Sequence, residues 1–87
     1  MKRTDEIRRR CAALHLLFAD KHGAHNTDAL DRVYLVCRSL RLLLDDAPSL
    51  AHVRMVEERA AAFFCGPGAE SLRPDIVRAL VFLDRRA

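Results

Sequence analysis

The chain has 87 residues, 51% of them apolar, and it contains no tryptophan. This length suits one domain with one core, and the apolar content excludes an intrinsically disordered chain. The net charge of +3 balances 15 basic against 12 acidic residues along the whole chain, so charge alone does not indicate a nucleic-acid-binding protein. Most basic residues are arginine, which is typical of a GC-rich bacterial genome and also of surfaces that bind carboxylates or phosphates.

The cysteine content and the hydropathy pattern predict a cytoplasmic protein. Cys11, Cys37 and Cys65 are odd in number and show no CxxC spacing, so they do not indicate a disulfide framework. We find no signal-peptide pattern, and no apolar run approaches the ~18 residues that a membrane span needs. The sequence therefore indicates neither a secreted protein nor a membrane protein.

The first predicted helix covers about residues 5–22. Thr4 is expected to cap it, and Gly23 is placed to end it in a left-handed conformation. Its apolar residues recur at helical spacing along one face: Ile7, Cys11, Leu14 and Phe18, with Leu17 beside them.

The second predicted helix, about residues 28–45, has the clearest pattern in the chain. Thr27 is its expected cap. Its seam steps by three and four residues, as in an antiparallel bundle: Leu30, Val33, Cys37, Leu40 and Leu44. Further apolar residues lie outside this seam: Tyr34, Leu35, Val36, Leu42 and Leu43. So apolar a helix should be covered on more than one flank, and we expect it at the centre of the fold.

Two more helices complete the prediction, at about residues 48–64 and 72–86. Pro48 suits the first turn of the third helix, and Ser71 is the expected cap of the fourth. The expected core residues of the third helix are Leu50, Val53, Val56, Ala60 and either Phe63 or Phe64. Those of the fourth are Ile76, Val77, Leu80, Val81 and Leu83. The sequence thus predicts one all-α domain over residues 1–87, a compact bundle of four short helices that dimerises.

Metal binding has two loose candidate sites. Cys11 and His15 share one side of the first helix, and Cys37 could approach them from the second. Both thiols also occupy apolar seam positions, where a free cysteine behaves as a small hydrophobe, and core packing is the interpretation we favour. The second candidate site is the pair His22 and His25, with Asp20 or Asp28; its alternative interpretation is a helix end followed by a loop. We assign no metal or cofactor.

Catalysis has little support in the sequence. The chain lacks the GxSxG, HExxH and glycine-rich phosphate-loop motifs. Cys65 is the one thiol outside a regular seam and is either reactive or packed beneath a turn, while His52 is expected to be solvated. We therefore predict a protein that is not an enzyme.

Two surfaces are candidates for binding. The residues expected at a protein interface flank the seam of the second helix: Tyr34, Leu35, Arg38, Leu42 and Leu43. The residues that would contact nucleic acid lie at the start of the chain, where Asp5 and Glu6 could neutralise part of their charge: Lys2, Arg3, Arg8, Arg9 and Arg10.

The function predicted from the sequence is that of a small cytoplasmic regulatory or adaptor protein. It would form a homodimer and bind an unidentified protein partner, without a cofactor. The alternative is a DNA-binding transcriptional regulator that uses the arginines of the first helix, and a metal-binding or enzymatic role comes third. We recognise no family, because four capped helices are common to many unrelated proteins.

Overall fold

Helices make up nearly all of the chain that the computed structural model describes, which comprises residues 2–19, 26–65 and 69–86. The elements are α1 (Arg3–Ala19), α2 (Thr27–Leu43), α3 (Ala47–Cys65), the short 3-10 helix η1 (Ala69–Leu72) and α4 (Arg73–Arg86). No strand occurs in these ranges. The predicted all-α, four-helix class is confirmed, although α1 begins earlier than the spacing indicated; its predicted end at residue 22 lies outside the described residues.

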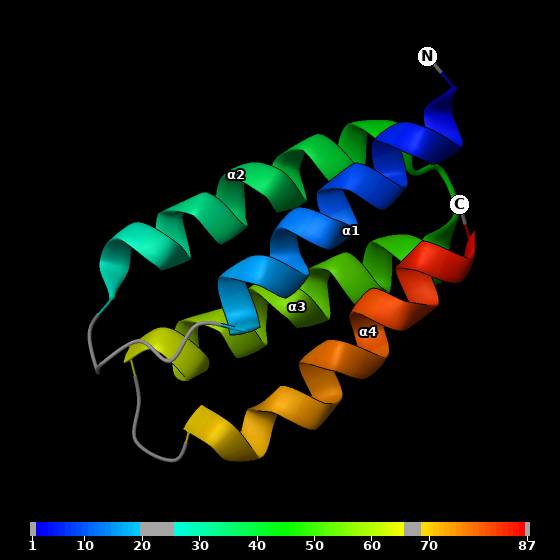
Figure 1. Ribbon diagram of the computed structural model, residues 1–87. Helices are drawn as coiled ribbons and strands as arrows, with labels where there is room; N and C mark the ends of the chain where they lie inside the picture. Colours follow the sequence, from blue (N-terminus) through cyan, green and yellow to red (C-terminus); the bar gives the residue numbers. More distant parts are fainter. Residues whose placement is uncertain (1, 20–25, 66–68, 87) are drawn as a thin grey trace.

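The four α-helices form a ring in which each packs against two neighbours (Figure 1). α1 packs along α2 and α4, and α3 packs along the same two helices, whereas the backbones of the diagonal pairs lie farther apart, and α1 reaches α3 through side chains in the core. Contacts between helix ends show that neighbours run antiparallel: the Asn26 N–H at the start of α2 donates to the Phe64 carbonyl near the end of α3. The result is an elongated up-down-up-down bundle with extents of 37 × 21 × 16 Å.

This ring corrects the predicted position of the second helix. α2 lies at the periphery like the other helices, and no element contacts its outer side within the described residues. The prediction that α2 lies at the centre of the fold is therefore wrong, although α1 and α3 do cover it on two flanks. A helix with two neighbours buries about half of its circumference, so the surplus apolar residues of α2 remain at the surface.

The helix starts use different caps from those predicted. Asn26 caps α2, because its side-chain oxygen accepts a hydrogen bond of 3.1 Å from the Ala29 N–H, while Thr27 is the first helical residue. Thr4 lies inside the first turn of α1. Ser71 belongs to η1. Pro48 does lie in the first turn of α3, as predicted. The expected stops at Gly23 and at residues 66–68 lie outside the described residues.

The core confirms most of the predicted apolar faces. Ile7, Cys11, Leu14 and Phe18 of α1 are all buried. In α4 the prediction is partly wrong, because Val77 and Val81 are exposed. The buried residues of α4 follow the helical repeat more strictly and include an alanine that we did not predict: Ile76, Ala79, Leu80 and Leu83.

One end of the bundle is closed by aromatic rings. Phe18 lies 5.3 Å from Phe63 and 5.4 Å from Phe64 between ring centroids. The Arg73 guanidinium lies 4.9 Å from the centre of the Phe63 ring and donates a hydrogen bond to the Phe18 carbonyl at the end of α1. Arg73 therefore joins α4 to α1 while it shields the rings.

Among the described residues, no helix has both the length and the apolar character needed to cross a membrane.

Candidate protein-binding surface

The outer side of α2 carries most of the predicted interface residues. Leu42 is 85% exposed and Leu35 is 63% exposed, and Tyr34 and Arg38 are also at the surface. Leu43 differs, because it is half-buried against the core and its carbonyl accepts a hydrogen bond from the Arg3 side chain. Four of the five predicted residues are therefore accessible to a partner, and Leu43 belongs mainly to the fold.

A groove runs between α1 and α2 beside this surface. Its lining is almost entirely apolar and consists of Ala13, Leu16, Leu17, Arg32, Leu35 and Val36. Its volume is about 390 Å³. Leu17 and Val36 are half-buried and pack against the core, whereas Leu16 stands 71% exposed at the edge. The groove offers apolar contacts and a single cation, Arg32.

The sequence interpretation missed Leu16 and Arg32 as members of this surface. The available signal was that Leu16 lies off the buried face of the first helix defined by Leu14 and Phe18. That signal identifies an exposed leucine, but it does not reveal that α2 lies beside it. Isolated surface leucines need no explanation, whereas an apolar groove does.

A second hollow lies on the other flank of Leu35, toward α3. It has a volume of about 370 Å³ and is lined by Asp31, Tyr34, Leu35, Arg38, Arg41 and Glu57. Arg41 and Glu57 form an ion pair that joins α2 to α3. In contrast to the groove, this hollow contains charges of both signs.

The predicted nucleic-acid contacts are partly occupied by acidic partners. Glu6 pairs with Arg10 one turn later and lies 3.8 Å from Arg9. Arg8 and Lys2 are exposed and form no ion pair within the described residues. Paired arginines attract phosphate less, so Glu6 weakens the positive field at the start of α1, as the sequence predicted. DNA binding by this region stays a prediction.

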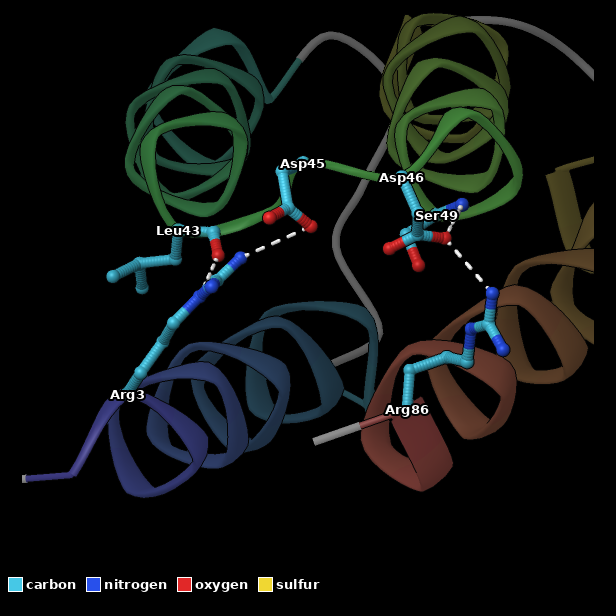
Figure 2. A network of polar contacts seen from close by, with 6 residues as sticks. All are labelled: Arg3, Leu43, Asp45, Asp46, Ser49 and Arg86. Carbon is cyan, nitrogen blue, oxygen red and sulfur yellow. Dashed lines mark hydrogen bonds and ion pairs between the residues drawn. The ribbon is translucent and has the colours of Figure 1, made fainter.

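Arg3, the remaining residue of that set, is part of the helix ends where α1 meets α2 (Figure 2). Its Nε donates a hydrogen bond to the Leu43 carbonyl. This carbonyl lies at the end of α2, where the helix itself supplies no N–H donor for it. Its guanidinium also lies 3.3 Å from the Asp45 carboxylate. Arg3 therefore helps to hold the ends of two helices together.

The neighbouring turn holds Asp46, which caps α3 (Figure 2). The Ser49 side chain, the Ser49 backbone N–H at 3.0 Å and the Arg86 guanidinium at 3.0 Å lower the pKa of the Asp46 carboxyl to about 2. The Ser49 hydroxyl oxygen is buried and makes no hydrogen bond of good geometry. We therefore attribute most of the lowered pKa to the backbone N–H and Arg86. This cluster caps α3 and links it to α4, so its role is to stabilise the fold.

The candidate metal ligands are buried or dispersed. Burial, with a smaller contribution from Asp84, raises the pKa of Cys11 to about 11. Burial, with a smaller contribution from Glu57, raises that of Cys37 to about 12. Both thiols stay protonated at neutral pH, which disfavours metal ligation and nucleophilic attack. His15 is half-buried. In the part of the chain described, no three His, Cys, Asp or Glu side chains cluster in a way that could hold a metal.

Two of the remaining candidates, His52 and Cys65, are partly covered by the fold. His52 is half-buried and stacks on Phe82, with ring centroids 3.8 Å apart, where we had expected a solvated side chain. Cys65 is half-buried. His22 and His25, with Asp20, lie outside the described residues.

Comparisons of the chain with protein-family models, curated proteins and solved structures give no match. The surfaces described above are therefore the basis for a functional proposal.

Proposed function

We propose that this chain is a small regulatory or adaptor protein that binds another protein in the groove between α1 and α2. The observation that carries the proposal is the exposure of Leu16 and Leu35 on either side of a nearly uncharged groove. Such exposure costs solubility, and contiguous exposed apolar surface usually marks a binding site. Apolar side chains of a partner would displace water from the groove, and this supplies the main driving force.

The chemistry of the groove favours one kind of occupant, an amphipathic helix. A partner helix can insert apolar side chains spaced one turn apart between two antiparallel helices. Arg32 is exposed at the edge of the groove and makes no ion pair within the described residues. An acidic side chain beside the apolar face of the partner would pair with this guanidinium.

The mechanism we propose is occlusion or bridging of the partner, with no chemistry of its own. The groove contributes methyl groups and a guanidinium, and neither attacks a substrate or transfers a proton at neutral pH. A covered helix on the partner would be unavailable to its other ligands. The proposal places this activity in the cytoplasm.

The test compares partner capture by variants from a lysate of the native host. Leu16→Glu places a charge in the groove, and Arg32→Glu reverses its one cation. Val77→Glu is the matched control, because Val77 is a partly exposed valine on α4, away from the groove. We expect a protein that wild type and the control retain, and that both groove variants lose.

Circular dichroism of each variant verifies that the bundle is folded. If Leu16→Glu captured the same proteins as the control, the groove would not be the binding site and the proposal would be wrong. A protein retained by all variants counts as background binding. Loss of capture by Leu16→Glu alone would support apolar docking and contradict the role of Arg32.

A further inference from the structure

The exposed side of α2 carries a stripe of alternating charge and leucine. Asp31, Leu35, Arg38 and Leu42 are spaced by four, three and four residues, so they lie along one line of the helix. All four are exposed. No other helix of the bundle covers this line in the described residues.

The two charges of this stripe are unpaired. Asp31 and Arg38 are seven residues apart, which separates them by about 10.5 Å along the helix axis and prevents an ion pair between them. Within the described part of the chain, neither side chain forms an ion pair or a hydrogen bond with another residue. The nearby Arg41 differs, because it already pairs with Glu57.

The order of these residues is self-complementary under a two-fold rotation. When two copies of one helix pack antiparallel, residues at equal distances from the two-fold axis face each other. Asp31 and Arg38 are equally far from the midpoint between Tyr34 and Leu35. With the axis at that midpoint, Asp31 of each copy faces Arg38 of the other, and both ion pairs form together.

The centre of the same arrangement is apolar. Leu35 of one copy meets Leu35 of the other on one side of the axis, and the two Tyr34 rings meet on the other side. The ion pairs then flank the buried leucine and tyrosine contacts, an order typical of protein interfaces, in which a polar rim surrounds an apolar centre. Leu42, the most exposed leucine, lies farther along the same line, beyond the ion pairs.

We propose that a second copy of this chain occupies the outer side of α2, in an antiparallel, two-fold symmetric α2–α2 interface centred between Tyr34 and Leu35. Charge complementarity favours a second copy over an unrelated partner, because one surface supplies both the acid and the base that the contact needs. The interface brings together equal numbers of positive and negative charges, so the contact itself adds no like-charge repulsion.

This inference can be tested separately from the groove between α1 and α2, although Leu35 lines the groove and also belongs to the stripe. The groove lies on the α1 flank of Leu35, and the stripe lies toward α3. The dimer uses neither Leu16 nor Arg32, so these two residues of each groove would stay accessible to a partner. Leu16→Glu should abolish partner capture and leave the dimer intact.

Charge reversal provides the test. Arg38→Asp places carboxylates opposite each other at two symmetric positions, and Asp31→Arg does the same with guanidinium groups. Each single substitution should weaken the dimer about tenfold or more. The double substitution Asp31→Arg/Arg38→Asp restores opposite charges across the axis and should recover the dimer. An equimolar mixture of the two single variants should also associate.

The matched control is Arg54→Asp, which reverses an exposed, unpaired arginine on α3. Sedimentation velocity measures the mass of wild type and variants from roughly 10 to 500 µM, a range that covers moderate dimer affinities. We expect wild type and control to approach twice the 9.9 kDa chain mass with rising concentration. Circular dichroism verifies that each variant is folded.

Three results would overturn the proposal. One is a wild-type chain that stays at 9.9 kDa throughout the concentration range. Another is a dimer that Arg38→Asp leaves unchanged. The third is a dimer weakened by both single substitutions but not recovered in the double variant or the mixture, because that result contradicts the pairing of Asp31 with Arg38.

Discussion

Two leucines of α2 allow the packing of this helix to be tested with a matched pair of substitutions. Leu40 and Leu42 lie two residues apart, so they point to different sides of the helix. Leu40 is fully buried, whereas Leu42 is 85% exposed. Replacement of either by alanine removes the same atoms and changes helix propensity equally, so only the surroundings of the side chain differ.

The expected losses of stability are far apart. Leu40→Ala removes buried methyl groups and leaves a cavity in the core, which costs about 3 to 5 kcal/mol of unfolding free energy. Leu42→Ala changes a side chain that is mostly in water and should cost within about 0.5 kcal/mol. Because a domain of this size has a stability of roughly 5 to 10 kcal/mol, Leu40→Ala removes a large fraction of it.

Urea unfolding followed by circular dichroism measures both changes. The protein concentration should be low enough that the chain is monomeric, because dimerisation would add to the stability of both variants. With a urea dependence of about 1 to 2 kcal/mol per molar, the midpoint should fall by at least about 1.5 M for Leu40→Ala and by less than about 0.5 M for Leu42→Ala. Equal losses, or a larger loss for Leu42→Ala, would show that α2 buries a different face.

Three further predictions concern a cap, a titration and the thiols. Asn26→Ala removes the side-chain oxygen that caps α2, and thermal unfolding should show a loss of about 1 kcal/mol; no loss would mean that another group satisfies the Ala29 N–H. Asp46 has a lowered pKa of about 2 in the folded chain, against an ordinary pKa of 3.8. Its charged form therefore stabilises the fold fully above pH 3.8, and this contribution is lost as the pH falls toward 2. Stability measured from pH 5 to 2 should therefore fall less steeply in Asp46→Asn than in wild type, and equal slopes would contradict the assignment. Cys11 and Cys37 should resist iodoacetamide at pH 8 and react once the chain is unfolded in urea, as followed by mass spectrometry, because burial keeps their thiols protonated. Rapid modification of both in the folded chain would exclude their burial.

The sequence determined the elements and the side of each helix that is buried. Val33, Cys37 and Leu40 repeat at helical spacing, and a helix with such a stripe must bury it to be stable in water. The same reasoning located the buried face of α1. It was less accurate for α4, since Val77 and Val81 are apolar but lie beside the buried face.

Only the tertiary structure decided which apolar residues stay exposed and what lies next to them. The spacing of apolar residues in the sequence shows which side of a helix is apolar. It does not show how many other helices pack against that helix in the fold. The closed ring gives α2 two neighbours, so Leu35 and Leu42 remain outside, and the packing of α1 beside α2 places Leu16 at the groove. The charges at the start of α1 show the same limit: Arg3 contacts residues some 40 positions away, because antiparallel helices bring distant segments together. The sequence thus determined which surfaces each helix can offer, and the arrangement of the helices decided which of them a partner can reach.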